Sequence, residues 1–141
     1  MMALFENRKR VIYDRTNSVP YLIRYYLFLI DRVKFPFNLT LHKILVSDLD
    51  DLHDHPWNYS TLILKGGYWE HTVNGKHWCG PGHFRICKAK DLHRLELSKD
   101  KDGKDIPCWS LFFMGKHQHD WGFVKNGEWI NNKKYLKEKY D

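Results

Sequence analysis

The segment LHDHPW, residues 52–57, contains two histidines that are separated by one residue. In an extended segment alternate side chains share a face, so His53 and His55 project in the same direction while Asp54 points elsewhere. Neutral imidazoles in this arrangement can converge on one metal ion. Two ligands seldom hold an ion by themselves, so a metal site here requires a third ligand from another part of the fold.

His93 is the best candidate for this third ligand. The segment DLHRLEL, residues 91–97, opens a predicted strand after a turn, and Leu95 and Leu97 lie on the same side of that strand as His93. The ring of His93 would therefore enter an apolar interior. The chain has nine histidines, and a single histidine is more often a hydrogen-bonded core or surface residue, so spacing alone does not single out His93.

The elements that must position these histidines are short strands. Aromatic residues make up 16% of the chain, and glycine and proline interrupt it regularly. Residues 21–29 could form a short helix, but their β-branched and aromatic content favours a strand. The sequence Asn74-Gly75 predicts a two-residue hairpin turn, and Asn131 or Asn132 could cap a short C-terminal helix. Further strands are expected near residues 38–47, 59–67, 68–73, 76–79, 83–89, 93–98 and 108–116, which predicts an all-β barrel or sandwich.

Two segments resemble the sequence motifs of the cupins. HDHPWNYSTLILKGG, residues 53–67, resembles the first motif, with two histidines separated by one residue and a glycine that ends the following strand. GHFRICKAKDLH, residues 82–93, resembles the second motif, with a glycine, a strand, a turn and a third histidine. More narrowly, LHDHPWNYSTLILKGGYWEH with the later HRLEL and WGF resembles a group of small bacterial and phage cupins.

The resemblance implies a single domain over residues 1–141. Its fold would be all-β, a cupin double-stranded β-helix (jelly-roll) barrel with a short C-terminal helix. The core barrel would span about residues 38–116, with an N-terminal strand extension over residues 1–37 and a C-terminal extension over residues 117–141.

The resemblance also implies a divalent metal ion on His53, His55 and His93. Iron is the first choice, with manganese, nickel or zinc as alternatives. The chain departs from the family pattern at Ser60, where a glutamate ligand is usual, and at Lys88 and Lys90, where proline and glycine are usual. Three readings of the missing glutamate stay open: a three-histidine site completed by water or substrate, a fourth ligand from elsewhere, or no metal. The candidates for a fourth ligand are Glu70, Asp51 and Asp48.

Several other residues could act on a substrate in such a site. Glu70, which shares a strand face with Tyr68, could be a general base, and His42 could act as an acid or base or support the metal ligands. Arg85 offers the paired donors that bind a carboxylate or phosphate. The further substrate-binding candidates are Ser60 and the aromatic residues Trp57, Tyr59, Tyr68 and Trp121.

Cupins carry many activities, so the fold does not fix the function. We expect a metal-dependent enzyme that acts on a small polar molecule, first an iron-type oxygenase, because three neutral histidines leave positions on the ion open. One alternative is a sugar or keto-acid isomerase or epimerase that uses acid–base chemistry. The other is a non-catalytic metal- or sugar-binding cupin.

Composition argues against several other classes. The formal charge of +6 is spread along the chain without a nucleic-acid-binding motif. The longest apolar stretch, YLIRYYLFLI, contains Arg24 and is too short to span a membrane, and no signal peptide is recognisable. Three cysteines without a CxxC pair favour a reducing, cytoplasmic location. We therefore expect a small-molecule substrate, no nucleic acid or membrane partner and, from the resemblance alone, a homodimer.

Overall fold

A computed structural model describes residues 7–13, 19–30, 35–48 and 50–140. The larger elements are antiparallel strands with turns between them, and a helix follows at the C-terminal end. The strands are β1 (Lys9–Tyr13), β2 (Pro20–Tyr26), β3 (Asn38–Ile44), β4 (Trp57–Lys65), β5 (Tyr68–Thr72), β6 (Gly75–Cys79), β7 (Phe84–Cys87), β8 (Arg94–Leu97), β9 (Cys108–His117), β10 (Gly122–Lys125) and β11 (Glu128–Asn131), and the helix is α2 (Asn132–Tyr140).

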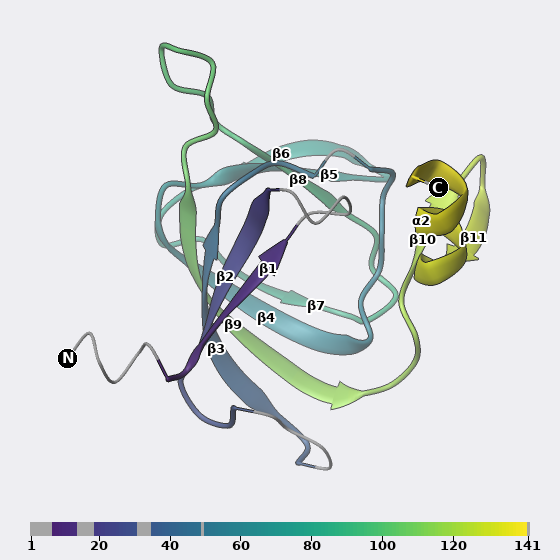
Figure 1. The fold of residues 1–141 in the computed structure, drawn as a ribbon, viewed down its shortest axis with the longest axis horizontal. Helices are drawn as coiled ribbons and strands as arrows, with labels where there is room; N and C mark the ends of the chain where they lie inside the picture. Colours follow the sequence, from purple (N-terminus) through teal and green to yellow (C-terminus); the bar gives the residue numbers. More distant parts are fainter. Residues whose placement is uncertain (1–6, 14–18, 31–34, 49, 141) are drawn as a thin grey trace.

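Two sheets enclose the interior. The larger one has six strands in the order β1-β2-β3-β9-β4-β7, and the smaller one has three strands in the order β6-β5-β8. Figure 1 shows the smaller sheet along one side of the barrel and β4, β7 and β9 along the opposite side. The hairpin of β10 and β11 lies with α2 at one margin of the barrel (Figure 1).

Alternation of side chains along the strands divides the interior into two regions. Inward residues near one end of the barrel form an apolar cluster of buried side chains. Further along the same strands the inward positions are polar, with Thr40 and His42 on β3 and Thr61 on β4, all buried. Buried polar side chains need hydrogen-bond partners. This second region is therefore held by hydrogen bonds as well as by apolar packing. The apolar cluster comprises Leu22, Ile44, Ile63, Tyr68, Cys79, Leu97 and Cys108.

The predicted hairpin between β5 and β6 forms, but its turn lies one residue earlier than expected. Thr72 pairs with Gly75, so Val73 and Asn74 are the two turn residues. Gly75 is the first residue of β6 and has a φ of 116°, a left-handed conformation that glycine adopts without a steric penalty. The glycine is therefore used at the start of β6, just after the turn, and not within the turn itself.

The other local expectations are met more directly. Residues 21–29 were expected to favour a strand, and β2 covers Pro20–Tyr26. The backbone N–H of Lys133 donates to Oδ1 of Asn131 at 2.9 Å, so Asn131, rather than Asn132, caps α2. In the described part of the chain, no helix has the length and apolar character needed to cross a membrane.

Gly66, which follows β4, offers a test of backbone packing. It has a φ of 82°, and a Cβ there would lie 2.6 Å from the carbonyl oxygen of Pro107. Gly103 has a similar φ of 79° but open space around its Cβ position. We expect Gly103→Ala to lower the free energy of unfolding by about 1–2 kcal/mol, the cost of a left-handed backbone. Gly66→Ala should lower it by at least about 1 kcal/mol more, because the added methyl group also clashes with backbone. Equal losses in urea unfolding would contradict this packing.

Candidate metal centre

His53 and His93 are held side by side by their own backbones. The N–H of His53 donates to the carbonyl of His93 at 3.0 Å, and the N–H of His93 donates to the carbonyl of His53 at 3.0 Å. This antiparallel bridge joins the loop before β4 to the residue that precedes β8. The two ring centroids are 5.0 Å apart. The third histidine of the sequence prediction therefore meets the first through main-chain hydrogen bonds.

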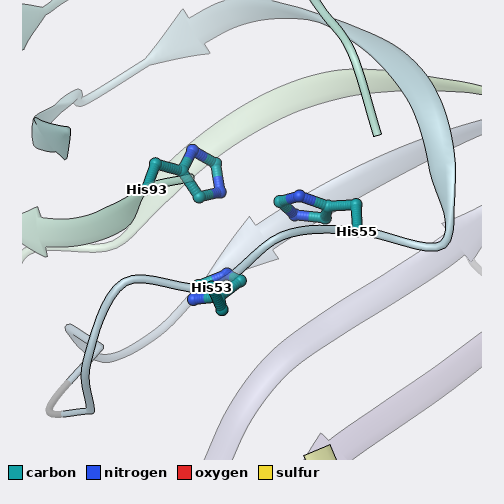
Figure 2. Close-up of side chains that lie close together, drawn as sticks. All are labelled: His53, His55 and His93. Carbon is teal, nitrogen blue, oxygen red and sulfur yellow. The ribbon is translucent and has the colours of Figure 1, made fainter. Parts of the chain in front are cut away.

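His55 completes the group from the other side. Its backbone N–H donates to the carbonyl of Ala89 at 2.9 Å, and its ring centroid lies 4.8 Å from that of His93 and 5.2 Å from that of His53. One ring nitrogen from each of the three histidines lies within 4.8 Å of the others, and the rings face one another in Figure 2. Among the described residues, no other group of three or more potential ligands of this kind is found.

The donor set fits a divalent transition metal. Imidazole nitrogens bind such ions at about 2.1 Å, so two nitrogens on one ion are at most about 4.2 Å apart, and binding requires the rings to turn slightly inward. Nδ1 of His55 is buried and makes no hydrogen bond within the described part of the chain. A buried imidazole nitrogen without a partner is costly, and coordination to an ion would satisfy it.

Burial keeps the imidazoles of His55 and His93 neutral, which is the form that binds metal. Burial lowers the pKa of His55 well below its ordinary value, and the neighbouring imidazoles of His93, His53 and His42 lower it further. The pKa of His93 falls to about 4, mainly through burial. Asp48 acts in the opposite direction on His93, and Arg85 adds to the lowering.

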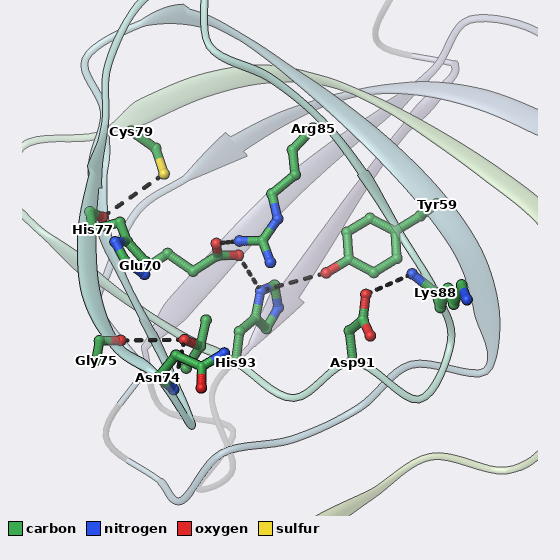
Figure 3. A network of polar contacts seen from close by, with 11 residues as sticks. Tyr59, Glu70, Asn74, Gly75, His77, Cys79, Arg85, Lys88, Asp91 and His93 are labelled. Atoms are coloured by element: carbon green, nitrogen blue, oxygen red, sulfur yellow. Dashed lines mark hydrogen bonds and ion pairs between the residues drawn. The ribbon is translucent and has the colours of Figure 1, made fainter.

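Glu70 fixes the orientation of His93. Oε2 of Glu70 lies 2.8 Å from Nδ1 of His93, and Glu70 also forms an ion pair with Arg85 (Figure 3). A carboxylate in an ion pair accepts hydrogen bonds and does not donate them, so Nδ1 of His93 carries the proton and Nε2 is left as the ligand atom. Partners of this kind orient metal-binding histidines and raise their basicity.

Tyr59 is a buried residue near the start of β4, and its side chain points into the barrel. Its hydroxyl lies 3.4 Å from Nδ1 of His93, and its ring centroid lies 4.4 Å from that of His55. Burial raises the pKa of Tyr59 well above its ordinary value, so the phenol stays neutral. Ser60 is the next residue along β4 and therefore lies on the opposite face of the strand.

The C-terminal extension supports the histidine loop. Asp54 is buried and accepts hydrogen bonds from the backbone N–H of Gly122 at 2.7 Å and from Nε1 of Trp129 at 3.0 Å. The hydroxyl of Tyr135, on α2, donates to Oδ2 of Asp51 at 2.7 Å. The carboxylates on either side of His53 thus tie its loop to β10, β11 and α2.

The three histidines open into a cavity of about 260 Å³. Its walls are mostly apolar and aromatic, as is usual for sites that bind small molecules. On β3, His42 stacks on Phe112 with ring centroids 4.6 Å apart, and Nε2 of His42 accepts a hydrogen bond from Nε of Arg24 at 3.1 Å. Burial, and secondarily Arg24, lower the pKa of His42 well below its ordinary value, so His42 is neutral as well.

Comparison with solved structures identifies the fold. A cupin-2 domain protein of Rhodospirillum rubrum, Rru_A2000, superimposes with a TM-score of 0.61 over 94% of this chain and 83% of its own, at 13% identity. The polyketide cyclase RemF of Streptomyces resistomycificus gives a TM-score of 0.60 over 82% of this chain and 78% of its own, at 16% identity. The chain folds as a cupin. The expected all-β cupin barrel with a short C-terminal helix is therefore confirmed.

A third solved structure also resembles this chain, whereas sequence comparisons find no relative. The protein described as FeII HppE superimposes with a TM-score of 0.56 over 77% of this chain and 57% of its own, at 12% identity. No protein-family model matches the sequence, and no curated protein matches it. Identities of this size establish the cupin fold and leave the chemistry to be argued from the site.

The cupin barrel brings some predicted substrate residues to the cavity and not others. Trp57, Tyr59 and Tyr68 line it together with the three histidines and His42. Arg85 and Glu70 line a second pocket, whose lining does not include the three histidines. Their mutual ion pair makes them a support for His93, whereas the sequence suggested a substrate-binding arginine and a catalytic carboxylate.

The remaining candidates for a fourth ligand have other partners. Asp48 accepts a hydrogen bond from the hydroxyl of Tyr21 and, at 2.8 Å, from the backbone N–H of Leu95. Asp51 is bound by Tyr135. Neither carboxylate joins the three imidazoles in the cluster of potential ligand atoms.

The sequence contained one signal that our prediction did not use. Arg24 lies between Leu22 and Tyr26 on β2, and both of these residues are buried. Because alternate residues of a strand share a face, a charged residue at this position must point inward, and the structure places Arg24 in the cavity wall. An inward arginine on an apolar strand face is a signal for a binding site.

Glu70→Gln tests the support of His93. The substitution keeps the shape of the side chain but removes the charge that holds the Nδ1 proton, so we expect the affinity for Zn²⁺, used as a probe ion, to fall about 10- to 100-fold. Competition with a fluorescent chelator measures it. Glu96→Gln is the matched control, because Glu96 contacts His71 at the same 2.8 Å distance in the same sheet without adjoining the three histidines. Equal effects of the two substitutions would contradict the assigned role.

Proposed function

We propose that this chain is a metal-dependent cupin enzyme that acts on a small molecule, with His53, His55 and His93 as the ligands of a divalent ion. One observation carries the proposal. Three imidazoles from two separate segments converge at the wall of an apolar cavity, and Nδ1 of His93 is already bound by Glu70. A buried polar cluster of this kind has a cost in stability that a bound ion would offset.

Iron is the ion we propose first, with manganese, nickel or zinc as alternatives. A bound divalent ion supplies a Lewis acid and, as iron, redox chemistry with dioxygen, so the proposed reaction is that of an iron-type oxygenase. FeII HppE shares the fold, which supports iron as the first ion to test. Three neutral ligands leave the charge of the ion uncompensated and its other positions open for a substrate.

The chain's own residues would bind and enclose the substrate. His53, His55 and His93 hold one end of the cavity, and Glu70 keeps the proton of His93 on Nδ1. Tyr59 and Phe112 stack with ring centroids 5.0 Å apart and cover the side of the cavity beside His55. These rings exclude water from the reacting end, which strengthens electrostatic interactions there.

A second candidate is acid–base isomerisation or epimerisation in the same cavity. The observation that favours it is His42, a neutral, buried imidazole in the cavity wall with Arg24 fixed on its Nε2. Because Nε2 accepts from Arg24, the neutral imidazole carries its proton on Nδ1 and could donate it to a bound substrate as a general acid, without a redox change. In this reading the three histidines would bind the substrate or an ion that polarises it.

The metal assignment predicts the metal content of variants. We expect purified wild-type protein to contain close to one equivalent of a transition metal, and His53→Ala and His93→Ala each to lose it, because two remaining imidazoles hold an ion weakly. Elemental analysis of untagged protein measures the content. His117→Ala is the matched control, because His117 is an exposed histidine outside the cluster. Retention of a full equivalent by both site variants would show that the ion, if any, binds elsewhere.

The oxygenase assignment predicts oxygen uptake. Protein loaded with iron(II) under anaerobic conditions should consume dioxygen at least about tenfold faster than His53→Ala when mixed with a panel of small hydroxylated and 2-oxo acids. An oxygen electrode measures the rate, and protein without added acid is the blank. Iron-loaded protein that gives no uptake above the variant would contradict oxygenase chemistry. Turnover of a sugar or keto acid that survives chelation would favour His42 acid–base chemistry instead.

A further inference from the structure

Arg24 is the cationic side chain in the wall of the cavity that holds the three histidines. It lies on β2 opposite His42 of β3, and His42 in turn pairs with Ser110 of β9. These three side chains form a polar row across neighbouring strands, and all three line the cavity. The three histidines line this same cavity, so the polar row and the three histidines share one chamber.

The hydrogen-bonding capacity of Arg24 is largely unused. Its Nε donates to Nε2 of His42 at 3.1 Å. In the parts of the chain that the structure describes, its terminal guanidinium nitrogens make no hydrogen bond or ion pair. A guanidinium group offers five N–H donors in a planar fork that suits the oxygens of a carboxylate or phosphate.

Arg85 provides the contrast. It was the arginine that the sequence suggested for binding an anion, but it forms an ion pair with Glu70 and lines a second pocket that does not include the three histidines. Arg24 lines the cavity of the three histidines and has no carboxylate partner among the described residues. Its cross-strand neighbour on β1 is Arg10, and like charges in directly opposed positions repel. An anion beside Arg24 would relieve this repulsion.

The other charges of the cavity do not neutralise Arg24. Asp48 and Asp54 also line the cavity, but each is hydrogen-bonded locally, Asp48 by Tyr21 and Leu95 and Asp54 by two donors of the C-terminal extension. With a divalent ion on the three neutral histidines, the charges that line the cavity would sum to a net positive value. An anionic group on the bound molecule would balance it.

We propose that Arg24 is the anion-binding residue of the cavity, and that the bound molecule has a carboxylate or phosphate at one end and a small apolar or aromatic body. The anionic group pairs with the guanidinium fork of Arg24. The apolar body lies against Phe112 and the other aromatic side chains of the wall, and the remaining part faces the histidines. The charge balance and the statement about the substrate rest on the proposed function, whereas the unused donors of Arg24 in the cavity wall do not.

Three single-ring probes test the inference by calorimetry on the full chain as purified: phenylacetate, phenyl phosphate and the neutral phenylacetamide. We expect the wild type to bind at least one of the anions more tightly than the amide, and Arg24→Gln to weaken that anion about tenfold or more while leaving the amide unchanged. The anion that binds better identifies the carboxylate or the phosphate as the recognised group. Arg94→Gln is the matched control, because Arg94 lies on β8 and is not among the residues that line the cavity.

Two further measurements, on Arg24→Lys and on the salt dependence of the wild type, still test the inference if Arg24→Gln is unstable. Arg24→Lys keeps the charge but loses the planar fork, so it should retain part of the affinity for the anion. In the wild type, added salt should weaken the anion and not the amide. Equal affinity of Arg24→Gln and wild type for both anions would overturn the inference, and so would a wild type that binds neither anion better than the amide.

Metal content, measured on the same samples, separates this inference from the proposed function. Arg24→Gln should keep the metal of the wild type, because Arg24 is not one of the three potential ligands. Loss of anion binding with the metal retained supports both. Arg24-dependent anion binding by a protein that contains no metal would support this inference and contradict the metal centre. Unchanged anion binding in metal-loaded Arg24→Gln would contradict this inference and support the metal centre.

Discussion

Two reciprocal main-chain hydrogen bonds between His53 and His93 hold the candidate centre together. They join a loop to a residue 40 positions further along the chain, just before β8, and they do so through backbone atoms that every residue type except proline possesses. The barrel therefore places the two residues side by side, and Glu70 then orients the ring of His93. His55 then needs only the extended backbone of the same loop to point its ring at the same place.

Burial of these histidines shapes the surroundings on both sides. Toward the cavity the pKa values of His42, His55 and His93 all fall, so the chamber contains uncharged imidazoles. At Nδ1 of His93, the carboxylate of Glu70 accepts the proton-bearing nitrogen's hydrogen bond, and the guanidinium of Arg85 balances the charge of that carboxylate. The result is that Nε2 of His93 is left for the ion while Nδ1 is held by Glu70. The negative charge of Glu70 is thus used for orientation and is not exposed in the cavity.

The sequence predicted the barrel and the three histidines better than their supports. Alternation, turn residues and the resemblance to the cupins were enough for the strands and for His93, because these depend on local pattern and chain order. The roles of Glu70 and Arg85 depend on their contacts with each other and with His93, which come from three separate segments of the chain and which no local pattern encodes. The hydrogen bonds that Asp54 accepts come from a hairpin almost 70 residues further along the chain. Arg24 could have been found, since it alternates with Leu22 and Tyr26 on an otherwise inward apolar face.

Anomalous X-ray diffraction from crystals of the metal-loaded protein, recorded on both sides of the absorption edge of the bound metal, tests the central claim most directly. The account predicts a single strong peak bounded by the rings of His53, His55 and His93, at about 2.1 Å from one nitrogen of each, with Nδ1 of His93 still directed at Glu70. A peak that contacts other side chains, or none at the three histidines in a protein that contains a full equivalent of metal, would contradict it.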